Sequence, residues 1–200
     1  MRKTLILPED ISEITLDQYQ RFYELNKRED LGPVEYTKRV LMIFANLKYR
    51  EVAAMQSTDF NGVVEIINKA IETDVEFVPR FKLDGVEHGF IPNLDEITIG
   101  EFSDMQEVGT NVETLHTLMA VLFRPVLKED FLGNYDIVPY AGTQHTEWSM
   151  KQMPMHVVNG ALFFFRNLAR ELRMSIQKST MEVAQKGVQI QNISKSGVGM

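Results

Sequence analysis

The chain has 200 residues, of which 44% are hydrophobic and 24% are charged, as is typical of a soluble globular protein. It contains no cysteine, which excludes disulfides, thiolate zinc sites and cysteine nucleophiles. No apolar run is long enough to span a membrane, so we expect a soluble protein inside a cell.

The first part of the chain predicts helices. A short strand is expected over residues 4–7, followed by a helix over residues 15–26 whose apolar residues share one face. Gly32-Pro33 predicts the start of a second helix, since proline suits the first helical position. A short helical turn over residues 50–56 and a helix over residues 60–72 follow.

The pattern changes to alternation after residue 74. Residues 75–81 and 86–91 alternate between apolar and polar side chains around a tight turn at Asp84-Gly85, which predicts a β-hairpin. Pro79 cannot donate to a neighbouring strand, so its own strand should lie at a sheet edge.

Helices are expected again in the second half of the chain. The pattern predicts helices over residues 99–107 and 112–123, the second ended by Arg124-Pro125. Residues 126–149 are loop-like, with an extended piece at residues 135–140. Pro154 then begins the longest predicted helix.

Two distant segments share one pattern. Residues 11–19 and 94–102 both read apolar-x-Glu-Ile-Thr-apolar-x-(Gln/Glu)-aromatic. Thr15 and Thr98 are N-cap candidates, and Gln18 and Glu101 stand three residues further on, as a capping box requires. We therefore expect both segments to begin helices and to superpose, either by duplication or by convergence on a common helix start.

These elements predict a mainly α fold with a minor β-hairpin, an α+β class. We expect a single globular domain over residues 1–186 with a flexible tail at residues 187–200. Within that domain we interpret residues 4–74 and 86–125 as repeats of a strand–helix–helix unit, with the hairpin at residues 75–92 and the C-terminal helix at residues 154–182.

The net charge of −7 is unevenly distributed. Residues 150–200 hold seven basic and two acidic residues, so the rest of the chain carries −12. No Lys or Arg stands between Lys82 and Arg124, where there are eight carboxylates. This pattern fits either a solvated acidic face or an acidic surface that meets basic partners, including the basic tail of a neighbouring subunit.

A search for chemistry finds no recognised site. The four histidines are scattered, and neither His145-Thr146-Glu147 nor Glu113 with His116 has a recognised metal spacing. The sequence has no glycine-rich phosphate loop and no Gly-x-Ser-x-Gly elbow. We therefore expect no catalytic residues, no metal and no cofactor.

A partner surface is the alternative to a catalytic site. Met residues beside a tryptophan form either core filling or an adaptable binding surface. The long C-terminal helix is apolar on nearly all sides at its middle, so it is either central in the fold or docked by a partner. The partner-binding candidates are Trp148, Met153, Met155, Phe163, Phe164, Arg166, Arg170 and Arg173.

Several stretches resemble small tailed-bacteriophage proteins of virion morphogenesis, most of them tail-assembly chaperones. The resemblance covers residues 5–175 and is carried by residues 11–22, 89–102, 118–125, 135–140 and 153–165. It implies a helical, non-enzymatic protein that binds an unassembled tail or tape-measure protein in the host cytoplasm.

Two other functions remain open from the sequence. The first is a structural virion component, such as a connector, tail or baseplate protein, and the second is an enzyme or regulator with an unrecognised site. For the phage reading we expect other phage proteins as partners, a homo-oligomer as a further possibility, and no direct binding of nucleic acid or membrane.

Overall fold

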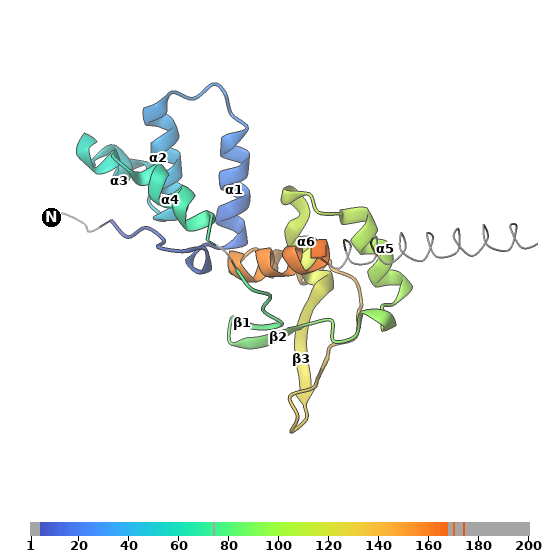
Figure 1. The fold of residues 1–200 in the computed structure, drawn as a ribbon. Coiled ribbons are helices and arrows are strands. Elements are labelled where there is room, and N and C mark those ends of the chain that lie inside the picture. Colours follow the sequence, from blue (N-terminus) through green and yellow to red (C-terminus); the bar gives the residue numbers. More distant parts are fainter. Residues whose placement is uncertain (1–4, 74, 168–169, 171–173, 175–200) are drawn as a thin grey trace, which may run out of the picture. The chain divides into compact units, whose positions relative to one another are not determined.

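The computed structural model describes residues 5–73, 75–167, 170 and 174 (Figure 1). The chain divides into two compact units, Met1–Ala161 and Leu162–Met200, and most of the described residues belong to the first. The boundary falls inside the helix expected over residues 154–182. The distal part of that helix and the tail at residues 187–200 lie outside the described residues.

The first half of unit 1 is helical, as the sequence predicts. Residues 5–7 are not a strand, so the first copy of the expected strand–helix–helix unit has no strand there. The elements are the 3-10 helix η1 (Ile11–Glu13), α1 (Leu16–Asn26), α2 (Pro33–Phe44), α3 (Tyr49–Ala53), the 3-10 helix η2 (Ser57–Phe60) and α4 (Val63–Ile71). The last helix therefore begins three residues later than the pattern indicates, after Gly62 at φ 75°.

The sheet is larger than the predicted hairpin. It has four antiparallel strands in the order β1 (Arg80–Leu83), β2 (Val86–Phe90), β3 (Phe123–Glu129) and β4 (Tyr135–Ile137). The turn between β1 and β2 has both central residues at positive φ, with Asp84 at 49° and Gly85 at 81°. This geometry confirms the predicted turn of the hairpin. The first strand is shorter than the expected residues 75–81, because it begins at Arg80, after Pro79, and it lies at an edge of the sheet.

The strand β3 replaces part of two other expected elements. The helix predicted to reach residue 123 ends at Leu122, and Phe123 to Pro125 pair with β2 instead. The stretch expected to be loop-like after residue 125 supplies the rest of β3. Pro125 is accommodated in the strand because its carbonyl oxygen can still accept, here from the backbone N–H of Val138 at 2.9 Å.

The remaining helices join and cover this sheet. They are the 3-10 helix η3 (Leu94–Glu96), α5 (Ile99–Val108), the 3-10 helix η4 (Val112–Thr114), α6 (Leu115–Leu122) and α7 (Glu147–Met150). Residues 155–161 are helical and complete unit 1. Because α6 packs against α5, α7 and β3, nearly every side chain along it is buried.

Both predicted helix starts are confirmed. Thr15 and Thr98 each accept the backbone N–H three residues further on at 3.2 Å, and Gln18 and Glu101 each accept the backbone N–H of their threonine. A 3-10 turn capped by an Asp or Asn side chain precedes each helix. The surroundings of the two starts differ, so duplication of the longer unit stays a prediction.

Backbone pairing closes unit 1. The N–H groups of Leu16 and Asp17 donate to the carbonyl oxygens of Met153 and Lys151 at 2.9 and 2.8 Å, and Met155 N–H donates to Ile14 O at 2.8 Å. The first two residues of a helix have no carbonyl partner of their own within the helix. The chain near residue 153 supplies those partners, and so ties the start of α1 to the end of the unit.

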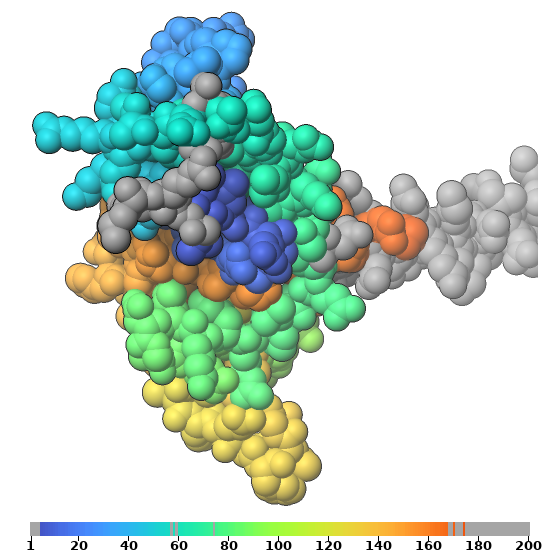
Figure 2. Space-filling view, turned by 90° about the vertical axis from the view of Figure 1, so that its left-hand side faces the viewer, coloured from blue at the N-terminus to red at the C-terminus, as the bar shows by residue number. Residues whose placement is uncertain are grey.

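The β3–β4 hairpin, yellow in Figure 2, projects from the rest of the unit and ends in an apolar tip. Phe131 is 94% exposed and Leu132 72% exposed. Asp130 holds the turn, because its carboxylate accepts the backbone N–H groups of Leu132 and Asn134 at 2.8 and 2.9 Å. The tip therefore keeps a defined shape although its two large apolar residues face solvent.

Two helical glycines give a matched test of the packing. A Cβ atom at Gly160 would lie 2.5 Å from the carbonyl oxygen of Glu76, whereas one at Gly100 would meet the Tyr140 ring at 3.6 Å and Thr98 Oγ1 at 3.9 Å, which are ordinary contact distances. We expect Gly160→Ala to reduce the free energy of unfolding by about 1–3 kcal/mol because backbone atoms must move. Gly100→Ala should raise it by about 0.5–1 kcal/mol. Urea unfolding measures both, and equal effects would contradict the close approach at Gly160.

Candidate partner-binding groove

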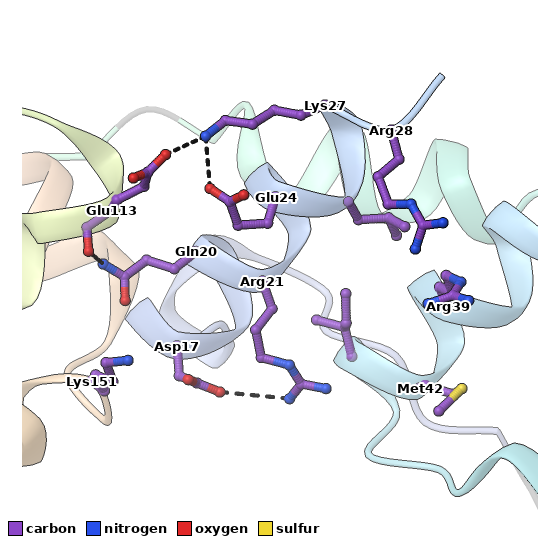
Figure 3. Close-up of a pocket in the computed structure, with 12 residues that line it drawn as sticks. Asp17, Gln20, Arg21, Glu24, Lys27, Arg28, Arg39, Met42, Glu113 and Lys151 are labelled. Atoms are coloured by element: carbon purple, nitrogen blue, oxygen red, sulfur yellow. Dashed lines mark hydrogen bonds and ion pairs between the residues drawn. The ribbon is translucent and has the colours of Figure 1, made fainter. Parts of the chain in front are cut away.

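A groove runs between α1 and α2 and has a volume of about 710 Å³ (Figure 3). Two of its lining side chains, Leu25 and Ile43, are buried and give it an apolar base. The helices stay together at its side because Gln18 Nε2 donates to the carbonyl oxygen of Ile43 at 3.0 Å. The full lining is Asp17, Gln20, Arg21, Glu24, Leu25, Lys27, Arg28, Arg39, Met42, Ile43, Glu113 and Lys151.

One border of the groove comes from η4, which docks on α1 through polar contacts. The buried side chain of Gln20 donates through Nε2 to the carbonyl oxygens of Val112 and Glu113 at 2.7 and 3.1 Å. Lys27 forms ion pairs with Glu24 on its own helix, at 2.7 Å, and with Glu113 (Figure 3). These contacts hold the groove's shape before any ligand enters.

The groove is locally positive in an acidic protein. Five basic and three acidic side chains line it. Arg21 pairs with Asp17 at 3.5 Å, and Arg39 pairs with Glu35 at 3.2 Å. These exposed pairs are weak and exchange readily with other anions. The arrangement suits an extended polypeptide that places apolar side chains on the base and carboxylates along the walls.

Trp148 lies next to this groove and is 64% exposed. Lys151, which lines the groove, holds its ammonium group 4.6 Å from the centre of the Trp148 ring. On its other side Trp148 meets the His116 ring, with 5.6 Å between centroids. A large exposed aromatic residue beside a charged groove has the composition expected of a binding hot spot.

His116 connects Trp148 with the buried part of the groove. Its Nδ1 lies 3.2 Å from Gln20 Nε2, which is a donor, so Nδ1 accepts when the ring is neutral. Burial lowers the pKa of His116 below its ordinary value of 6.5, and the charge of Lys151 lowers it further, while Glu147 acts in the opposite direction. The fold therefore favours the neutral ring.

The predicted partner-binding residues of unit 1 separate into two environments. Trp148 is exposed as the hypothesis requires. Met153 and Met155 are 0% exposed and fill the core below the N-terminus of α1, so they offer no surface to a partner in this fold. The methionines therefore fill the core, which is the first of the two alternatives for them. They are buried because residues 14–17 pair with residues 151–155 through the backbone.

The other candidates belong to the second unit. Phe163 is 45% exposed, and the Arg166 guanidinium lies 4.9 Å from the centre of its ring. Phe164 is half-buried and packs edge-to-face with Phe165 at 5.7 Å, and Arg170 is exposed. Arg173 lies outside the described residues.

Sequence reasoning missed a buried ion pair on the other side of unit 1. Glu101 Oε1 lies 2.5 Å from Arg124 Nη2, and only 5% and 12% of the two side chains are exposed. Burial acts to raise the pKa of Glu101, but hydrogen bonds from Thr98 and the Arg124 charge outweigh it and lower the pKa. The capping-box pattern identified Glu101, but no signal in the sequence indicated its pairing with Arg124.

Two features are absent from the residues that the structure describes, namely a cluster of metal ligands and a membrane-spanning helix. In this part of the chain no three His, Asp or Glu side chains come together as metal ligands would. None of the helices in the described ranges is both long enough and apolar enough to cross a lipid bilayer. Within the groove, Lys27 pairs with Glu24 and Glu113, and Arg21 pairs with Asp17.

Comparisons with protein-family models, with curated proteins and with solved structures found no significant match.

The neighbouring His116 and Trp148 make a spectroscopic test of the groove. Trp148 is the chain's only tryptophan. We expect its fluorescence to titrate with a midpoint below pH 6.5, because an imidazolium quenches an adjacent indole and the pKa of His116 is lowered. His116→Gln should abolish this titration, whereas His88→Gln, which removes a buried histidine of strand β2, should leave it intact. A titration that persists without His116 would contradict the assignment.

The stability of the folded chain should also depend on the protonation of its buried histidines. Burial lowers the pKa of His88, His116 and His156 below 6.5, so the unfolded chain binds more protons than the folded chain as the pH falls. The contribution of these three histidines to the free energy of unfolding is therefore complete above pH 6.5 and is lost as the pH decreases below that value. We expect thermal unfolding to shift to lower temperature between pH 7 and pH 5, and less so in His116→Gln. An unchanged pH dependence in that variant would argue against a neutral buried ring.

Proposed function

We propose that this chain is a non-enzymatic assembly protein of a tailed bacteriophage, a tail-assembly chaperone that binds an unassembled tail or tape-measure protein. The observation that carries the proposal is the groove between α1 and α2 with the exposed Trp148 beside it. The sequence resemblance to phage morphogenesis proteins gives the biological setting. In that setting the protein works in the host cytoplasm.

The chemistry of the groove specifies the kind of segment it would hold. Its base is formed by the apolar Leu25, Met42 and Ile43, and basic side chains outnumber acidic ones along its walls. A ligand with alternating apolar and acidic residues in an extended or helical form would satisfy both features. Such a segment is exposed on a tail protein only before assembly, because its apolar residues become buried in the finished structure.

Trp148 should dominate the affinity for this segment. Large aromatic residues with a rigid, preorganised position contribute most to binding at protein interfaces. We expect Trp148→Ala to weaken binding of the captured tail protein by about 2 kcal/mol or more, roughly 30-fold. Tyr49→Ala is the matched control, since Tyr49 is a 52% exposed aromatic residue that also carries a lysine over its ring but does not line the groove.

The experiment is co-expression of the full chain with the tail and tape-measure proteins of the same phage, followed by affinity purification and calorimetry of the complex. Circular dichroism shows that each variant is folded. Failure to capture any tail protein, or equal affinity for both variants, would overturn the groove as the binding site.

Mass spectrometry of purified particles separates the chaperone from a structural virion component. A chaperone leaves the finished structure, so we expect the chain to be absent from particles and present in the lysate of infected cells. Detection at stoichiometric levels in the particle would replace the chaperone role with that of a connector, tail or baseplate component.

A further inference from the structure

Helix α5 shows an inverted distribution of side chains. Its only fully buried residue is Glu101, whereas Ile99 is 89% exposed and Phe102 is 54% exposed. Ile99, Phe102 and Gln106 follow helical spacing and share one exposed face. Helices on a protein surface normally turn their apolar face inward, so an outward apolar face indicates a surface that another chain covers.

Carboxylates surround this face. Asp95 and Glu96 precede α5 and Glu107 lies near its end, and all three are exposed. The segment between Lys82 and Arg124 contains no basic residue that could neutralise them. The face is therefore apolar at its centre and negative at its rim, the arrangement expected of an interface for a basic partner.

The second unit displays the opposite arrangement. Phe163 and Met174 are 45% and 53% exposed, and Arg166 and Arg170 are exposed between them. The spacing of these four residues puts them along one side of a helix, and the described residues 162–167, 170 and 174 are helical. This face has two basic residues between two exposed apolar residues.

The net charges of the units are complementary as well. Residues 162–200 contain six basic and two acidic residues, a net charge of +4. Residues 1–161 contain the other fifteen basic and twenty-six acidic residues, a net charge of −11. Opposite charges of this size attract two copies of the chain toward each other when the second unit of one copy approaches α5 of the other.

We propose that the α5 face, defined by Ile99, Phe102, Glu96 and Glu107, binds the basic face of the second unit of another copy, defined by Phe163, Arg166, Arg170 and Met174. Apolar side chains of the two faces then pack together, and the arginines meet carboxylates at the rim of the α5 face. This self-association goes beyond the proposed chaperone function and uses neither the groove nor Trp148.

The contact joins two different surfaces, so after pairing each copy keeps one free face, and the pair displays one free face of each kind. Such heterologous contacts continue from copy to copy and produce rings when the rotation closes, or open filaments when it does not. The expected product is therefore a series of oligomers that grows with concentration.

Charge reversal tests the pairing directly. Light scattering after size-exclusion chromatography measures the mass of the full chain between about 1 and 100 µM, the range in which a complex with micromolar Kd forms. We expect oligomers for the unmodified chain. Glu96→Lys with Glu107→Lys, or Arg166→Glu with Arg170→Glu, should weaken association at least tenfold, because like charges then face each other.

The decisive experiment combines both charge reversals, at the α5 face and in the second unit, in one chain. The quadruple variant restores opposite charges across the contact, so its oligomers should return. An equimolar mixture of the two double variants should form alternating oligomers, because the α5 face and the second unit of each variant both meet the opposite charge on the other variant. Glu65→Lys in α4 with Glu72→Lys at its C-terminal cap makes the same charge change at exposed positions elsewhere and should leave association unchanged.

An unmodified chain that remains monomeric at every concentration would overturn the proposal. So would a quadruple variant that is folded by circular dichroism but does not associate. Binding of a tail protein through the groove is measured separately, and its failure would leave the oligomers unaffected.

Discussion

The pairing of residues 14–17 with residues 151–155 is the constraint on which unit 1 depends. Three backbone hydrogen bonds between 2.8 and 2.9 Å connect segments that are about as far apart in sequence as the unit allows. They satisfy the first N–H groups of α1, which would otherwise be buried without partners. They also bring Met153 and Met155 under the helix start, where both are completely buried. The same contacts therefore close the unit, cap α1 and form this part of the core.

The groove is a consequence of the same closure. The pairing places Lys151 beside Asp17 on α1, and the turn before it carries α7 with Trp148. The border formed by η4 depends on Gln20 and Lys27, which fasten η4 to the middle and end of α1. Thus α1 contributes to every wall, and the charged side chains of the groove come from segments that meet only when the chain is folded. A partner that binds here therefore recognises side chains that only the folded unit brings together.

Local patterns in the sequence predicted local structure well and tertiary structure poorly. The capping boxes at Thr15 and Thr98 and the Asp84-Gly85 turn follow from neighbouring residues, and all three are confirmed. Strand β3 was missed because Phe123 continues the apolar run of α6 and Arg124-Pro125 indicates only a helix end, whereas pairing with β2 selects the extended form. The groove could not be predicted, since Gln20, Glu113 and Lys151 are remote in sequence. The exposure of Trp148 agrees with the partner hypothesis, whereas burial of the adjacent methionines depends on a contact with residues 14–17.

The position of Glu101 explains why α5 presents its apolar residues outward. The capping box fixes Glu101 at the third position of the helix, and its carboxylate already accepts the backbone and hydroxyl of Thr98 at 2.7 and 2.6 Å. The same carboxylate pairs with Arg124 at the start of β3, so this side of the helix must face the sheet. Ile99 and Phe102 stand two residues before and one residue after Glu101, which turns them away from that side at 100° per residue. A buried ion pair stabilises less than apolar packing of the same volume would. Its value here lies in orientation, because it directs the apolar face of α5 toward solvent, where a second copy of the chain can bind.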